Sequence, residues 1–201
     1  MESVDKQILK SVKKCGRGFV FFADRFSHFG TPVRVRKAME QLVASGDIIR
    51  VARGIYCYPK IDKMFGLGVL YPGANEIAKV IALKDKAQIV PTGEFAQYQL
   101  GLTQQIPMNV IYLTDGYSRT VKLIKGGTIT LKHAAPKNFA YKNKIAMMVT
   151  SALRTMGQNE VTEEHIQIVR DHLRKQPKNI VFQDLQMMPD WIKLIVQKAY
   201  E

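Results

Sequence analysis

Apolar residues recur with helical spacing at the start of the chain. Over residues 4–15 they fall on one face of a helix whose lysines lie largely outside, and glycines at 16 and 18 end the pattern. Ser3 is expected to cap this helix. The apolar run FVFF then leads, as a short strand or loop, into a second predicted helix over residues 23–29.

A third predicted helix begins at Thr31-Pro32. The threonine hydroxyl can accept a hydrogen bond from a free helix N–H, and proline at the first helical position loses no hydrogen bond. The inward stripe of this helix consists of Val35, Met39, Leu42 and Val43. Arg36 falls on a flank. The residues that point away from the stripe are long polar donors, namely Arg34, Lys37 and Gln41.

Two strand-like runs follow, over residues 48–51 and 54–58, around a tight turn that carries Arg53. Three helices followed by a basic hairpin are typical of a winged helix-turn-helix DNA-binding domain. The alternative is an ordinary hairpin with a solvated arginine. Pro59 ends the hairpin, and the segment IDKMFGLGVLYPGAN suits a connector packed against the body. We therefore place a domain boundary near Lys60, between a domain of residues 1–60 and a larger one of residues 61–201.

The larger part mixes helices and strands. A helix is expected over residues 74–84, a strand over 88–91, and a second helix, EFAQYQLGL, capped by Thr92. The runs NVIYLT, TVKLI and TITLKHA are separated by Asp-Gly and Gly-Gly turn signals, which predicts an antiparallel β-meander. Helices are expected over residues 144–156, 162–175 and 189–200. Grouped strands and segregated helices indicate an α+β fold.

The net charge of +13, from 30 basic and 17 acidic residues, favours a polyanionic partner, with double-stranded DNA the first candidate. A merely soluble basic protein is the alternative. No run approaches the roughly 20 apolar residues of a membrane span, and the start of the chain lacks a signal-peptide core. Cys15 and Cys57 form no CxxC pair. We expect a reduced, cytoplasmic protein that has no membrane partner.

The enzyme motifs with understood geometry are absent from the sequence: it contains no GxxxxGK[ST], GxGxxG, HExxH or GxSxG, and no zinc spacing. His165 and His172 lie seven residues apart near acidic residues, but polar positions of an amphipathic helix explain them better than a metal site does. We therefore predict no catalytic residues, no metal and no cofactor.

The region after Asp115 carries a second concentration of basic residues. Seven lysines and arginines between positions 115 and 144 face one acidic residue, a net charge of +6. A solvated sheet face and a functional basic patch are equally good interpretations of these charges.

Two segments resemble the AbiEi-type antitoxins of type IV toxin-antitoxin systems from bacterial abortive infection. One is the run that ends in GDIIRVARGIYCYP, and the other is PTGEFAQYQLGLTQQIPMNVIYLTDGYSRTVKLIKGGTITLKHAAP. The resemblance implies a repressor that binds inverted repeats in its own promoter and counteracts a nucleotidyltransferase-like toxin. It implies DNA contacts from Arg34, Lys37, Arg50 and Arg53, and an antitoxic basic face of Arg119, Lys122, Lys125, Lys132 and Lys137.

Combining both lines of reasoning, we expect the DNA-binding residues to be Thr31, Arg34, Lys37, Gln41, Arg50 and Arg53. Two other functions stay open. The second domain could be a partner- or ligand-binding module of a plain transcription regulator, or it could modify the toxin or its nucleotide substrate. The toxin encoded in the same operon is the second expected partner.

Overall fold

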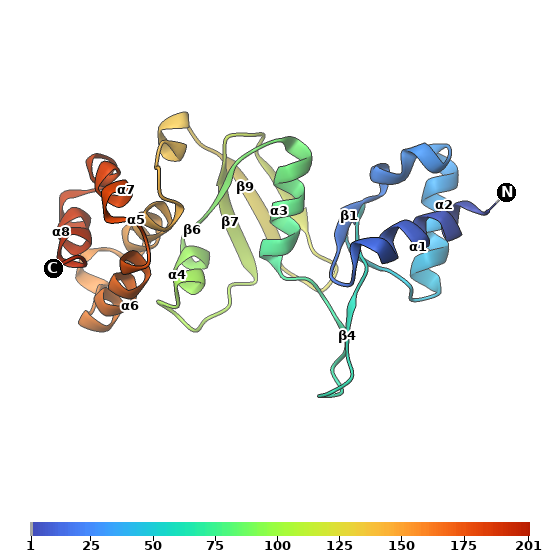
Figure 1. The fold of residues 1–201 in the computed structure, drawn as a ribbon, viewed down its shortest axis with the longest axis horizontal. Helices are drawn as coiled ribbons and strands as arrows, with labels where there is room; N and C mark the ends of the chain where they lie inside the picture. The colour runs from blue at the N-terminus through green and yellow to red at the C-terminus, as the bar shows by residue number, and fades with distance from the viewer. Residues whose placement is uncertain (1) are drawn as a thin grey trace. The chain divides into compact units, whose positions relative to one another are not determined.

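The computed structural model describes residues 2–201, which form an α+β fold divided into two compact units (Figure 1). The first unit extends to Lys84 and also includes Val121–Gly127. The second consists of Asp85–Thr120 and Thr128–Glu201. The chain first passes from one unit to the other at the end of a helix, Ala74–Asp85. The end of the basic hairpin at Pro59 predicts a boundary nearer to Lys60.

The first unit opens with helices and a three-stranded antiparallel sheet. Its elements are α1 (Val4–Cys15), β1 (Val20–Phe22), η1 (Ala23–Phe29), α2 (Pro32–Ala44), β2 (Ile49–Ala52) and β3 (Ile55–Cys57). The strand order is β1-β3-β2, so the second strand of the β2–β3 hairpin lies at the centre. The helices pack on this sheet around a core that includes Ile8, Phe21, Phe26, Met39 and Ile48.

Two local expectations for this unit need correction. Ser3 occupies the N-cap position of α1, but its side chain makes no capping hydrogen bond. The second helix, η1, is a 3-10 helix interrupted by non-helical backbone at Phe26. Its position agrees with the prediction. The buried Phe26 ring, edge-on to Phe21 at 5.4 Å, anchors the segment at this interruption.

The predicted connector after Pro59 is also different. It forms an antiparallel hairpin of β4 (Lys60–Asp62) and β5 (Gly68–Leu70), followed by α3 (Ala74–Asp85). Its apolar side chains are exposed and not packed against the body, with Met64 85% and Phe65 76% exposed. The Asp62 carboxylate accepts hydrogen bonds from three backbone N–H groups of the loop. These N–H groups therefore have partners within the hairpin, although the loop does not pack against the rest of the unit.

The second unit contains a four-stranded sheet and a helical end. Its strands are β6 (Ile89–Thr92), β7 (Asn109–Thr114), β8 (Arg119–Lys122) and β9 (Thr128–His133), in the order β6-β7-β9-β8. The last two residues of β8, Val121 and Lys122, are grouped with the first unit. The expected antiparallel meander is therefore wrong, because β7 pairs in parallel with β9, while β8 lies at the edge. β7 and β9 each bury alternate residues, most of them apolar, and β8 buries none.

Helices pack beside this sheet and beyond it. They are α4 (Glu94–Leu100), η2 (Pro136–Phe139), α5 (Lys144–Met156), η3 (Gln158–Glu160), α6 (Glu163–Arg174), α7 (Lys178–Gln183), η4 (Leu185–Met187) and α8 (Asp190–Lys198). The N-cap of α4 is Gly93, not Thr92, whose hydroxyl instead lies 2.6 Å from that of Ser151. The core of this helical part includes Leu100, Val149, Leu153, Val169 and Ile192.

Candidate nucleic-acid interface

The start of α2 is fixed by its own sequence. Thr31 stands at the N-cap and its hydroxyl accepts a hydrogen bond from the Arg34 N–H at 3.5 Å, while Pro32 takes the first helical position. The carbonyl of Thr31 accepts from the Val35 N–H at 2.9 Å. These local interactions fix the residue at which the helix begins.

The two faces of α2 differ in chemistry as the periodicity predicts. Val35, Met39 and Leu42 are buried against the core of the first unit. Arg34, Lys37 and Gln41 are exposed on the opposite side. Within residues 2–201, neither Arg34 nor Lys37 takes part in an ion pair. The helix therefore offers two uncompensated cations and an amide to a partner.

The β2–β3 hairpin adds two more arginines. Arg53 is exposed in the two-residue turn, which Gly54 closes with a φ of 75°, a conformation that costs glycine little. Arg50 is exposed on β2, opposite Tyr56 of β3. A groove of about 380 Å³ lies among η1, α2 and this hairpin, and both Arg36 and Arg50 line it. The flanking position of Arg36 thus brings its side chain toward the hairpin and not toward the far side of α2.

A segment distant in sequence joins the same unit. Leu123 forms an antiparallel bridge with Ala52, and the Ile124 N–H donates to the Val51 carbonyl at 2.9 Å. Lys122 and Lys125, expected in the basic face of the second domain, are exposed on this segment. Two of those five residues therefore belong to the unit that carries α2. No local pattern could have revealed this, because the pairing spans some seventy residues of sequence.

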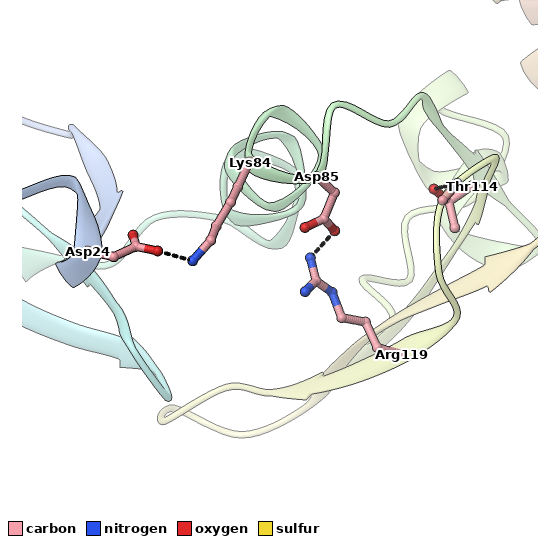
Figure 2. A network of polar contacts seen from close by, with 6 residues as sticks. Asp24, Lys84, Asp85, Thr114 and Arg119 are labelled. Carbon is pink, nitrogen blue, oxygen red and sulfur yellow. Dashed lines mark hydrogen bonds and ion pairs between the residues drawn. The ribbon is translucent and has the colours of Figure 1, made fainter.

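The other three residues of that expected face lie in the second unit. Lys132 is exposed on β9 and Lys137 on η2. Arg119 forms an ion pair with Asp85, so its charge is partly compensated (Figure 2). The five basic residues are thus divided between two units, and one of them already has an acidic partner.

Figure 2 also shows the second ion pair of this region, between Lys84 and Asp24 at 2.5 Å, which lies wholly within the first unit. The Lys84 ammonium also lies 4.1 Å from the centre of the Phe22 ring. These contacts tie the end of α3 to η1 and β1, and they remove Lys84 from the set of available cations.

Charge is distributed unequally between the two units. The first contains 17 basic and 7 acidic residues, a net charge of +10, and the second contains 13 basic and 10 acidic residues, a net charge of +3. Most of the positive charge of the chain thus accompanies α2 and the β2–β3 hairpin. A positive potential concentrated on one unit attracts a polyanion to that unit.

The two histidines of α6 make local hydrogen-bonding contacts. His165 completes the capping box of α6 with Thr162, and the Nε2 atom of His172 lies 2.9 Å from the Leu100 carbonyl oxygen. In the described part of the chain, no cluster of three or more His, Cys, Asp or Glu residues could hold a metal ion. Among the described helices, none has the length and apolarity that crossing a membrane requires.

Comparison with known proteins gives the family of the chain. No curated protein matches it significantly. The model of the DUF6088 family, described as a family of unknown function, matches residues 7–181 and therefore most of the chain. The chain belongs to the DUF6088 family.

Proposed function

We propose that the first unit is a winged helix-turn-helix domain that binds double-stranded DNA. The observation that carries the proposal is the coincidence of a net charge of +10 with a helix whose exposed face bears Arg34, Lys37 and Gln41. Such side chains donate to base edges and phosphates, and an α-helix fits the major groove of B-DNA.

The parts of this unit have different roles in the proposed complex. α2 enters the major groove, where Arg34 and Gln41 reach base edges and Lys37 contacts the backbone. Arg53, at the tip of the β2–β3 hairpin, contacts the neighbouring phosphates. Thr31 and Arg50 complete the contact set at the start of α2 and on β2. Phosphate contacts position the domain, whereas base contacts select the sequence.

The biological role that we propose is that of a cytoplasmic repressor and antitoxin without catalytic activity. This part rests on the resemblance of the two segments to AbiEi-type antitoxins. The second unit, with Lys132 and Lys137 exposed, would counteract the toxin. To distinguish this role from that of a plain regulator, the protein is co-expressed with the product of the neighbouring gene. An antitoxin should restore the growth that this product inhibits. Absence of toxicity, or failure to rescue, refutes the antitoxin role and leaves the DNA-binding proposal intact.

The DNA-binding proposal is tested by fluorescence anisotropy with the DNA upstream of the gene and a scrambled duplex of equal length. We expect tighter binding to the upstream DNA, and a steep loss of affinity between 50 and 200 mM salt, of about a thousandfold or more if six or more phosphates are contacted. Equal affinity for both duplexes refutes sequence-specific binding. Affinity that does not change with salt refutes the electrostatic interface.

A further inference from the structure

The β4–β5 hairpin of the first unit presents an unusual apolar surface. It stands away from the sheet of β1, β2 and β3, with which it shares no strand pairing (Figure 1). Its exposed apolar side chains lie close together in sequence, between residues 61 and 71. With their exposed fractions they are Ile61 45%, Met64 85%, Phe65 76%, Leu67 68%, Val69 44%, Leu70 38% and Tyr71 40%. Contiguous apolar surface of this kind marks an interaction site.

The loop of this hairpin is fixed by hydrogen bonds. The Asp62 carboxylate accepts from the N–H groups of Met64, Phe65 and Leu67 at 3.1, 3.1 and 3.2 Å. Charge-assisted hydrogen bonds of this type hold the loop in one conformation. The loop that carries these apolar side chains is therefore already ordered, so less conformational entropy is lost when a partner binds.

The two edges of the hairpin differ in their protection. β4 and the loop residue after it carry Lys60, Asp62 and Lys63, the kind of charges that prevent edge-to-edge pairing. The run from Met64 to Tyr71, MFGLGVLY, carries no charge. Among the described strands β5 pairs only with β4, so its outer edge presents unpaired backbone groups. β5 is the unprotected edge.

We propose that β5 pairs antiparallel with β5 of a second copy of this chain, which forms a twofold-symmetric dimer through a four-stranded sheet. Strand pairing centred on Val69 places Val69 opposite its own copy and Gly68 opposite Leu70 of the second copy. The residues of β5 are uncharged, so the strand edge can pair with its own copy, and the nearest cation is Lys125, whose ammonium lies 4.7 Å from the centre of the Tyr71 ring. A twofold interface requires this self-complementarity.

The seven exposed residues present on the order of 800 Å² of apolar surface in total. Pairing through β5 buries only the part of it around Val69 and Leu70, because Ile61 lies on β4 and Met64 and Phe65 lie in the loop. The β4 edge makes a poorer interface, because its charges must be desolvated. The proposal is independent of DNA binding, although a twofold dimer would present two copies of α2.

The first test measures mass by sedimentation or light scattering at micromolar protein concentration without DNA. We expect twice the chain mass of 22.8 kDa for the unmodified protein and the single-chain mass for Val69→Lys. The matched control is Leu194→Lys, which changes a 58% exposed leucine on α8 and should leave the dimer intact. Circular dichroism verifies that each variant is folded. A monomeric unmodified protein, or a Val69→Lys variant that stays dimeric, overturns the proposal.

Cysteine cross-linking tests the register in the same full-length chain. The exposed Cys15 is first replaced by serine, and Cys57 is buried. Val69→Cys should then form an intermolecular disulfide on mild oxidation, because directly opposite residues of antiparallel strands lie within disulfide distance. Met64→Cys is the more exposed position but lies off the twofold axis, and it should cross-link far less. Equal cross-linking at both positions contradicts the register centred on Val69.

Discussion

Leu123 pairs with Ala52 across an antiparallel bridge, and this contact assigns a loop of the second half of the sequence to the unit that carries α2. A hydrogen bond beside this bridge strengthens the pairing: the carbonyl of Val51, on β2, accepts from the Ile124 N–H at 2.9 Å. Lys122, the last residue of β8, and Lys125, on the loop after it, fall within Val121–Gly127 and therefore add to the charge of the first unit. Their sequence position alone suggests a role in the other domain.

Because the exposed lysines are divided between the two units, their contributions to DNA binding can be measured separately. The double variant Lys122→Ala, Lys125→Ala should weaken DNA binding and reduce the slope of log K against log salt by up to about 2, because each lost phosphate contact removes about 0.9 from that slope. The matched control Lys132→Ala, Lys137→Ala removes the same charge from the second unit and should leave the slope nearly unchanged. Salt titrations by anisotropy measure both. Equal slopes for the two double variants would contradict the assignment of Lys122 and Lys125 to the DNA-binding unit.

Arg34 and Arg53 should contribute differently to DNA recognition. Replacing Arg34 by alanine should cost about 1–3 kcal/mol on the preferred duplex and relax sequence choice, because a base contact is lost. Replacing Arg53 by alanine should weaken binding to all duplexes by a similar factor, because phosphates carry no sequence information. The measurement is the affinity ratio between upstream and scrambled DNA. The assignment of roles fails if Arg34→Ala leaves this ratio unchanged.

Local signals predicted α2 and the β2–β3 hairpin well. The Thr31-Pro32 start and the spacing of Val35, Met39 and Leu42 act over a few residues, and the structure confirms both the helix and its buried face. The exposure of Arg34, Lys37 and Gln41 follows from the same spacing. Where short-range sterics and one apolar stripe determine an element, its residues alone specify it.

The strand order in the sheet of the second unit could not be predicted from local sequence signals. The turn signals between the predicted strands are real, but they do not specify strand order. β8 buries none of its residues, whereas β9 buries Ile129 and Leu131, so β9 gains more by pairing with β7 in the interior. The β4–β5 hairpin was also predicted incorrectly. Its apolar sequence resembles that of a buried segment, and the hydrogen bonds from three loop N–H groups to the Asp62 carboxylate cannot be recognised from that sequence.

Asp184 should stabilise the second unit more than any surface acid. It is fully buried, and its carboxylate accepts from the N–H groups of Lys142 and Asn143 at 2.7 and 2.8 Å. Asp184→Ala leaves both donors without their partner and should lower the free energy of unfolding by about 2–4 kcal/mol. Urea denaturation measures this. The control Asp190→Ala removes an exposed acid paired with Lys193 and should change the free energy of unfolding far less, because solvent screens an exposed ion pair.

Cys57 should make the stability of the first unit depend on alkaline pH. Burial, aided by the charge of Glu76, raises the pKa of this thiol from 9.0 to about 11. The folded chain therefore binds the thiol proton more tightly than the unfolded chain does. The resulting stabilisation is complete below pH 9 and is lost as the pH rises through 11, with a total of about 3 kcal/mol.

The matched comparison uses Cys57→Ala, which has no thiol at this position. Tyrosines and lysines titrate in both proteins, so the difference between their free energies of unfolding isolates the contribution of Cys57. The unmodified protein should lose stability more steeply between pH 9 and 11 than Cys57→Ala does. Thiol titration gives an independent measurement: the exposed Cys15 should react in the folded protein and Cys57 only after unfolding. Parallel stability curves for the two proteins, or rapid reaction of both thiols, would show that the Cys57 thiol is accessible to solvent.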